Sequence, residues 1–305
     1  MPNKLLPVVF MLSSTASLSV TGLLTKYLTT VVPISLLSFL RFAVPALILL
    51  AFLAVSRFRI PERAMLKPLA VRAVCLAACQ VCFIYSLQHL SLVEGVVLFS
   101  TGPLFIPLLE KLIFGVRMPW VTVAGLIATF TGVVMLSGDV TQMEWRPELL
   151  AGLFAGLFNA GSQLSLYKAS KSSLRSVEIN VWSFTMAAAM LFPMLTLVPW
   201  HSALDLSMDR HLLLTVATLV VVSLLVINTQ VFRAKAYRLA ESGSQLAPLI
   251  FTNLLFSAAL QLLFFNVSYT AAQQLGLVLI VVATVSTSLL PKLWHAASHR
   301  LNSAS

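Results

Sequence analysis

The chain has 305 residues, of which 59% are hydrophobic and only 10% are charged, and its mean hydropathy is strongly positive. This composition excludes an ordinary soluble domain and predicts an all-α integral membrane protein that crosses a bilayer several times. The net charge of +10 does not indicate nucleic-acid binding, because the basic residues lie in short clusters beside apolar runs, without interleaved aromatic residues.

Apolar runs of about 20 residues, the length that crosses the hydrocarbon core, follow one another along the chain. They predict ten transmembrane spans, at residues 5–27, 33–55, 69–88, 93–113, 119–137, 148–168, 177–199, 211–233, 243–265 and 271–291. The connections between these spans are too short to fold as soluble domains, so we expect the function to lie among the helices.

The connections fall into two alternating sets that differ sharply in charge. The set that contains both termini carries 16 of the 20 basic residues: Lys4, Arg57, Arg59, Arg63, Lys67, Arg72, Lys111, Arg117, Lys168, Lys171, Arg175, Arg233, Lys235, Arg238, Lys292 and Arg300. Positive residues in short loops stay on the cytoplasmic side, so we expect both termini in the cytoplasm. The expected location is the inner (cytoplasmic) membrane, with an even number of crossings.

A weak internal repeat divides the chain into two halves. Pro103 is followed by a span, a linker and Gly125, and Pro248 is followed by a span, a linker and Gly276. Five spans is an odd number, so two consecutive five-helix units enter the membrane from opposite faces. We therefore expect two inverted repeats, residues 1–145 and 146–291, around a central cavity, followed by a cytoplasmic tail at 292–305.

Three segments carry a family resemblance: "SLLSFLRFAVPALILL", "FIYSLQHLSLVEGVVLFSTGPLFIPLL" and "AKAYRLAESGSQLAPLIFTNLL". Together with ten spans in two halves, they resemble the EamA branch of the drug/metabolite transporter superfamily. The resemblance implies the inverted-repeat fold and transport. Members often carry a Glu after the fourth and ninth spans, where this chain has Gly115 and Asn266, so any role of that Glu is not carried over.

Arg41 is an ionisable residue deep in the second span. A charge there is costly in lipid, so it should face the protein interior. Two interpretations are open: a cationic anchor or gating partner for a substrate, or a structural Arg that binds carbonyl groups.

Other polar and aromatic side chains lie within the spans and are candidates for lining the pocket. Their alternative role is ordinary hydrogen bonding and packing between membrane helices. With Arg41, the predicted substrate-binding residues are Gln80, Tyr85, Asn159, Gln163, Trp182, Asn228 and Asn253. On the sixth span Gly152, Gly156 and Ala160 form a ridge of small residues that should let another helix approach closely.

Four residues are candidates for gating. Pro103 and Pro248 lie within apolar runs, where proline permits a bend, so we expect hinges in matching places of the two halves. Glu110 and Glu178 lie near the expected cytoplasmic face with Lys111 and Lys171 nearby, which predicts gate or interface ion pairs.

The sequence supports neither catalysis nor a cofactor. The five histidines lie at span ends, in loops or in the tail, no metal-ligand spacing occurs within a span, and there is no nucleotide-binding loop. No carboxylate sits mid-span as a proton relay. We expect a secondary carrier that exports a small organic metabolite by alternating access, with an amino acid or related zwitterion as the favoured substrate. A multidrug or nucleotide-type carrier, an intramembrane enzyme and a scaffold are the alternatives, and a homodimer is compatible with the sequence.

Overall fold

A computed structural model of the protein describes residues 5–54, 60–89, 98–115, 120–137, 148–197, 210–265, 270–283 and 286, and within these ranges the regular structure is helical. Six helical spans are long and apolar enough to cross a membrane. They are α1 (Leu6–Val31), α2 (Ile34–Ala54), α3 (Arg63–His89), α7 (Glu148–Ser170), α8 (Ser176–Leu191) with the 3₁₀ helix η1 (Phe192–Leu197), and α10 (Arg210–Leu239).

The remaining helices are shorter and also apolar. They are α5 (Gly102–Phe114), α6 (Trp120–Ser137), the 3₁₀ helix η2 (Ser244–Leu246), α11 (Ala247–Ile250), α12 (Thr252–Phe265) and a last helix, Ala271–Ala283. The described helices thus support a protein with several membrane crossings. The count of ten stays a prediction, because the fourth and tenth predicted spans include residues outside the described ranges.

Helix ends follow from proline and glycine. α1 stops because Val32 precedes Pro33 and is extended, with φ −122° and ψ 131°. α5 stops at Gly115, whose φ of +66° is the left-handed conformation that glycine adopts readily. Pro193 lies in η1, where the regular helix of α8 changes to a 3₁₀ turn.

The fourth and ninth predicted spans are interrupted. Leu104 N–H donates to Thr101 O at 2.9 Å, and Leu254 N–H donates to Phe251 O at 2.9 Å, so each break is closed by a three-residue turn. After these breaks, α5 continues to Phe114 and α12 continues to Phe265. The halves therefore contain similar broken helices, a feature that hydropathy alone does not predict.

The prolines do not occupy matching places at these breaks. Pro103 is the second residue of α5 and follows the turn at Thr101, whereas Pro248 is the second residue of α11 and precedes the turn at Phe251. In the first turn of a helix proline removes no intrahelical hydrogen bond. The breaks therefore lie on opposite sides of the two prolines, and the hinge role of these prolines stays a prediction.

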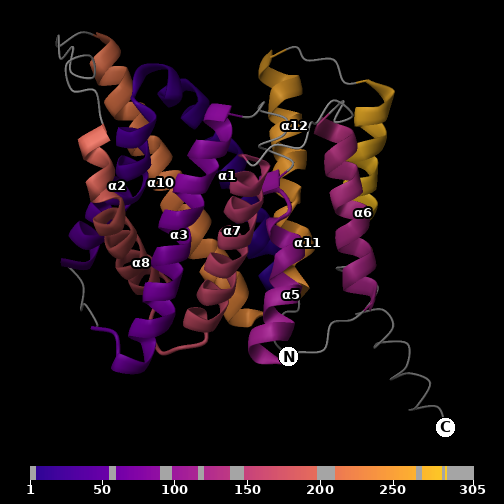
Figure 1. Ribbon diagram of the computed structural model, residues 1–305, viewed down its shortest axis with the longest axis horizontal. Coiled ribbons are helices and arrows are strands. Elements are labelled where there is room, and N and C mark those ends of the chain that lie inside the picture. Colours follow the sequence, from indigo (N-terminus) through magenta and orange to yellow (C-terminus); the bar gives the residue numbers. More distant parts are fainter. Residues whose placement is uncertain are drawn as a thin grey trace.

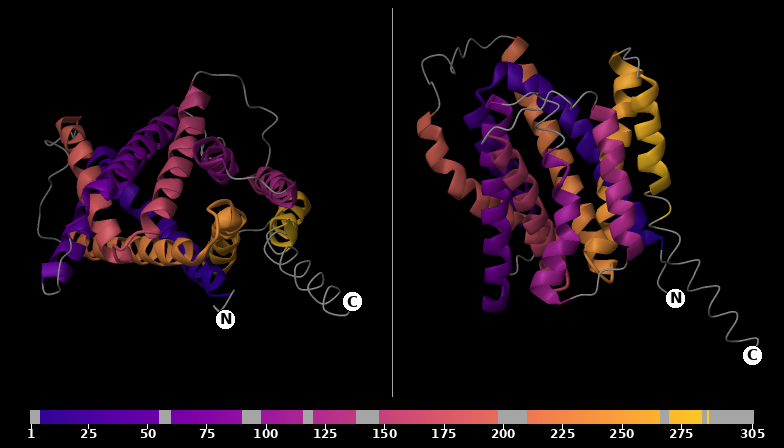
Figure 2. Two further views of the ribbon diagram at one scale, coloured as in Figure 1. Left: turned by 90° about the horizontal axis from the view of Figure 1, so that it is seen from below. Right: turned by 45° about the vertical axis from the view of Figure 1, so that its right-hand side comes forward.

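Helix packing exchanges partners between the halves. α3 lies along α7 and α1 lies along α10, while α5 packs on α7 and α12 packs on α1 (Figures 1 and 2). α2 packs on α8. At one end of the molecule, α6 meets the last helix, where a Cβ on Gly132 would lie 2.7 Å from Gly276 O. This close contact joins the fifth predicted span to the tenth.

Apolar side chains fill the contacts and also cover the outside. The largest buried cluster joins α1, α3, α7, α8, α10, η2 and α11 and includes Met11, Leu69, Leu166, Ile179 and Tyr237. Leu47, Leu112, Leu213, Leu263 and Val278 are among many large apolar residues that are more than half exposed. A surface of this kind fits lipid rather than water.

Candidate functional site

Two of the predicted amides tie helices of different halves together. Asn228 Nδ2 on α10 donates to Ser17 Oγ on α1 at 2.7 Å. Ser19 Oγ donates to Asn253 Oδ1 on α12 at 2.8 Å. Beside them Thr15 and Thr252 share a hydrogen bond of 2.8 Å between their hydroxyl groups. These polar residues therefore form hydrogen bonds between helices, which was the alternative to lining a pocket, and a substrate that binds here must compete with these hydrogen bonds.

Arg41 and Gln80 lie at the contact between α2 and α3. Gln80 Nε2 donates to Ser38 Oγ at 3.3 Å, three residues before Arg41. Arg41 is only partly exposed and lies near Cys79 of α3. The side chain thus lies against a neighbouring helix, which leaves both interpretations of Arg41 open.

Asn159 and Gln163 form a polar pair on α7. Gln163 Nε2 donates to Asn159 Oδ1 at 3.4 Å, and Gln163 Oε1 is buried without a partner among the described residues. Asn159 also lies against α5, because a Cβ on Gly102 would be 3.1 Å from Asn159 Nδ2. This pair keeps an unused acceptor inside the bundle, as a polar binding surface requires.

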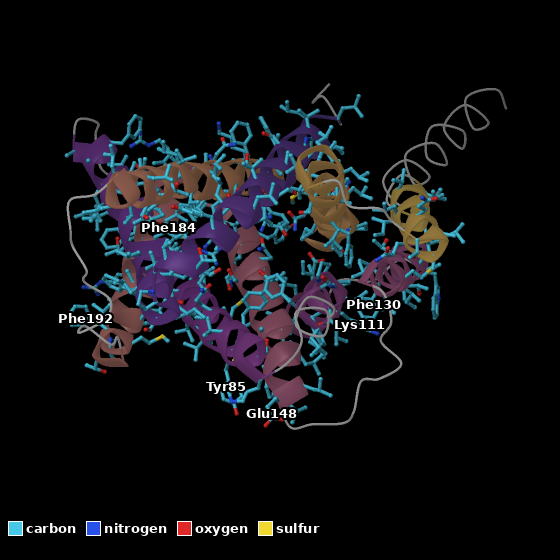
Figure 3. All side chains as sticks on the ribbon, turned by 90° about the horizontal axis from the view of Figure 1, so that it is seen from above. Tyr85, Lys111, Phe130, Glu148, Phe184 and Phe192 are labelled. Carbon is cyan, nitrogen blue, oxygen red and sulfur yellow. The ribbon has the colours of Figure 1, made fainter. Side chains whose placement is uncertain are left out.

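The two predicted aromatic residues, Tyr85 and Trp182, lie in different surroundings. Tyr85 is 45% exposed and stacks on His89 with ring centroids 4.4 Å apart, and Figure 3 places it at the outer edge of the bundle. Trp182 is half-buried and packs against the largest apolar cluster. The structure therefore brings Trp182 inside and leaves Tyr85 at the rim.

The predicted gating carboxylates are both buried, and each caps a helix start. Glu178 pairs with Arg175 at 2.8 Å and accepts the Arg175 backbone N–H at 2.8 Å, which closes the first turn of α8. Glu110 on α5 accepts backbone N–H groups of Gly243 at 2.7 Å and Ser244 at 2.9 Å. Glu110 therefore links the first half to the connection between α10 and η2, through backbone groups rather than through a lysine.

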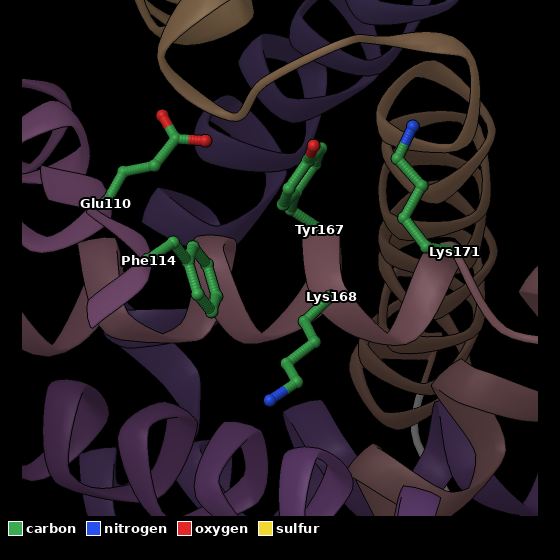
Figure 4. Close-up of a pocket in the computed structure, with 5 residues that line it drawn as sticks. All are labelled: Glu110, Phe114, Tyr167, Lys168 and Lys171. Atoms are coloured by element: carbon green, nitrogen blue, oxygen red, sulfur yellow. The ribbon is translucent and has the colours of Figure 1, made fainter. Parts of the chain in front are cut away.

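A pocket of about 220 Å³ opens beside Glu110, between the last turns of α5 and α7, and Figure 4 shows its lining. Tyr167 donates to Glu241 O at 2.6 Å, and Lys171 Nζ donates to Arg238 O at 3.0 Å and also to Ala240 O. Partial burial lowers the pKa of Lys171, and nearby Glu241 opposes this shift. These side chains hold the α10–η2 connection in place, so the pocket is better explained as part of that link than as a solute site.

The structure also places in the core two arginines that the charge count groups with the cytoplasmic connections. Arg72 on α3 is fully buried, and Arg233 on α10 is 3% exposed. Arg72 Nη2 donates to Asn180 Oδ1 at 2.9 Å and Gln230 Oε1 at 3.1 Å, and Arg233 Nε donates to Ser14 Oγ at 3.2 Å. All three of these acceptors are neutral groups, so the site is strongly cationic.

Both arginines lie close to the ends of the predicted spans 69–88 and 211–233, where a basic residue is expected to reach the membrane surface, but the helices extend further than these spans. α3 begins at Arg63 rather than at residue 69, and α10 continues to Leu239 rather than stopping at 233. One signal is present in the sequence: Gln230, Arg233 and Tyr237 recur at three- and four-residue spacing, which puts them on one helix face.

Comparisons with known proteins agree with the resemblance found in the sequence. A model of the EamA-like transporter family matches residues 5–138. Two curated relatives, the pseudopaline exporter CntI of Pseudomonas aeruginosa strains PAO1 and UCBPP-PA14, are each 28% identical over 222 residues, covering 72% of this chain and 74% of the relative. A solved crystal structure covers 94% of this chain and 98% of its own, with a TM-score of 0.75 and 18% identity, which shows a shared fold.

Proposed function

Since the chain is related through residues 5–138 to the EamA-like transporter family, we propose that it exports a small organic metabolite by alternating access. The two curated relatives are exporters, which supports the outward direction. The favoured substrate is an amino acid or related zwitterion, because the interior offers amides, hydroxyl groups and buried cations.

The observation that carries this proposal is the exchange of helix partners between the halves. α3 packs on α7 as α10 packs on α1, and α5 packs on α7 as α12 packs on α1. Two inverted repeats, 1–145 and 146–291, would produce such reciprocal contacts, and rocking of one repeat against the other is the usual basis of alternating access. The ten crossings, the cytoplasmic termini, the tail at 292–305 and the inner-membrane location belong to the same proposal.

The substrate site would lie between the halves, lined by the predicted residues that the structure keeps inside. Ser17–Asn228 and Ser19–Asn253 join α1 to the second half, and Asn159 with Gln163 faces α5. Breaking and remaking these bonds would couple the solute to helix movement, because a solute shifts a conformational equilibrium only through contacts that differ between the states.

Flux in liposomes tests the proposal. The full chain, purified and reconstituted, should exchange labelled amino acids against a preloaded unlabelled pool, and liposomes without protein should not. Arg41→Gln should slow exchange, whereas Arg63→Gln, at an exposed position, should leave it unchanged. Turnover of an added lipid or peptide without flux would favour an enzyme, and neither activity would favour a scaffold; both results would contradict a carrier.

A further inference from the structure

Arg72 of α3 and the side chains of one face of α10 form a cationic cluster in the interior of the bundle. Gln230, Arg233 and Tyr237 share the face of α10 that meets Arg72, so the two guanidinium groups, whose like charges repel, lie near each other and near the Tyr237 hydroxyl group. Arg72 lies nine residues after the start of α3, about 14 Å along the helix at about 1.5 Å per residue. Arg233 lies six residues before the end of α10. Both are therefore well inside the bundle, nearer its lower end.

Several donors of this cluster have no acceptor in the part of the chain that the structure describes. Arg72 Nε and Nη1, Arg233 Nη2 and the Tyr237 hydroxyl group are buried without a hydrogen-bond partner among the described residues. An arginine side chain stays charged, so the cluster holds two positive charges that cannot be removed by losing a proton. Buried donors and buried charges are normally paired, and within the described ranges no carboxylate pairs with these two arginines.

The polar groups next to this cluster already have hydrogen-bond partners. Asn180 Nδ2 donates to Ser176 O at 2.8 Å, which turns Asn180 Oδ1 toward Arg72. Glu110 interacts electrostatically with Tyr237, but its two oxygens accept the backbone N–H groups of Gly243 and Ser244. Within the described ranges, neither buried arginine forms an ion pair with a carboxylate.

We propose that Arg72 and Arg233 bind the carboxylate group of the transported solute, with the Tyr237 hydroxyl group as a third donor. Guanidinium groups present paired N–H donors that match the two oxygens of a carboxylate. This inference rests on the proposed transport function and narrows its substrate class to carboxylates. The side chains are closed to solvent in this conformation, so the solute reaches them in a state where α3 and α10 are further apart.

Binding measured without flux tests the proposal. The probes are L-alanine, L-phenylalanine and L-glutamate, each compared with its C-terminal amide at constant ionic strength, and sodium chloride alone. The readout is the thermal unfolding midpoint of the full-length protein in detergent, since a ligand of the native state raises it. At least one acid should raise the midpoint while its amide and chloride do not.

The arginine variants then locate the site. Arg72→Gln and Arg233→Gln should weaken the acid's binding at least about tenfold, which corresponds to about 1.4 kcal/mol. Lys235→Gln makes the same charge change two residues from Arg233 but at an exposed position, and should bind as the unchanged protein does. If a glutamine variant does not fold, Arg72→Lys, Arg233→Lys and Tyr237→Phe serve instead, and each should weaken binding of the acid but not folding.

The opposite results are equally clear. Equal stabilisation by acids and amides, a full shift from chloride alone, or equal weakening by Lys235→Gln would overturn the carboxylate site. Stability lost in the arginine variants with unchanged ligand shifts would assign these residues a purely structural role. Liposome flux that persists in the arginine variants would overturn the carboxylate site and leave the transport proposal standing. Acid binding that depends on the arginines, without any flux, would support the carboxylate site and contradict transport.

Discussion

At the residue scale, glycine sets how closely two helices of this bundle approach. A Cβ on Gly156 would lie 2.6 Å from Thr101 Oγ1 and 3.0 Å from Leu98 O, whereas a Cβ on Gly22 would meet nothing within 4 Å. The sequence predicted a close approach at the small-residue ridge of α7, and these distances confirm it for Gly152 and Gly156. The segment that packs against this ridge runs from Leu98 to Gly102 and leads into α5.

Gly156→Ala should therefore destabilise the protein by about 1–3 kcal/mol, because backbone atoms of the neighbouring segment must move. Gly22→Ala makes the same change in the middle of a helix with open space around it. It should be neutral or stabilise by up to about 1 kcal/mol, since alanine favours helix over glycine. Thermal unfolding of both variants in one detergent measures the difference, and equal midpoints would contradict the packing described for Gly156.

The residues at the cationic cluster show where sequence reasoning stops. Hydropathy places helices by apolar runs, and the charge count groups Arg72 and Arg233 with the cytoplasmic connections because they lie near the ends of the predicted spans 69–88 and 211–233. Their burial depends on which helices meet, since Arg72 is held by Asn180 of α8 and Gln230 of α10. Contacts between residues more than a hundred positions apart leave no trace in a single local pattern.

At the element scale, Glu110 is the point where α5 holds the connection between α10 and η2. Its carboxylate accepts two backbone N–H groups at the start of η2, and hydrogen bonds to a charged acceptor contribute about 1.5–3 kcal/mol each. Glu110→Gln keeps the size of the side chain but turns one acceptor oxygen into a donor group, which cannot accept the second N–H.

We expect Glu110→Gln to lower the free energy of unfolding by about 2 kcal/mol, because one charge-assisted bond is lost. Hydrogen exchange of the amides of Gly243 and Ser244 should speed up in the same variant. Glu241→Gln is the matched control, since Glu241 is exposed in the same connection and should change stability by less than about 0.5 kcal/mol. Unchanged amide protection in Glu110→Gln would argue against this link.

The broken helices are a second feature of this scale. Hydropathy predicted two continuous spans, yet α5 begins after a turn at Thr101 and α12 begins after a turn at Phe251. Apolar residues on both sides of each break hide it from a hydropathy window. The prolines were visible in the sequence, but their positions relative to the turns were not.

The hinge role of these prolines stays a prediction that transport kinetics can check. Pro103→Ala restores a backbone N–H that can bond to the turn before α5, and Pro248→Ala restores one that can bond to η2, so each change favours a continuous helix on the N-terminal side of the proline. Each should slow amino-acid exchange several-fold while the thermal shift with a bound solute stays the same. Exchange at the unchanged rate in both variants would exclude them as hinges.

At the scale of the whole molecule, the sequence predicted the features that composition determines and missed those that helix assembly determines. The high apolar content predicted an all-helical membrane protein, and the described part has six helices long enough to span a bilayer. The reciprocal packing of α3 on α7 and α1 on α10 required the structure, because helix partners depend on surfaces that no single helix displays. Reciprocal packing is also what the proposed inverted repeats would produce.

That topology makes one decisive prediction about orientation. α3 ends at the upper end of the bundle, and the connection between α7 and α8 lies at the lower end (Figure 1); His89 is the last residue of α3, and Arg175 belongs to that connection. If the basic residues stay in the cytoplasm, a membrane-impermeant thiol reagent should label a cysteine at position 175 only from the cytoplasmic side and one at 89 only from outside. Cys75, Cys79 and Cys82 in α3 must first be replaced by serine. Labelling of both positions from the same side would mean that α3 and α7 do not run between opposite faces, and two inverted five-helix halves would then be impossible.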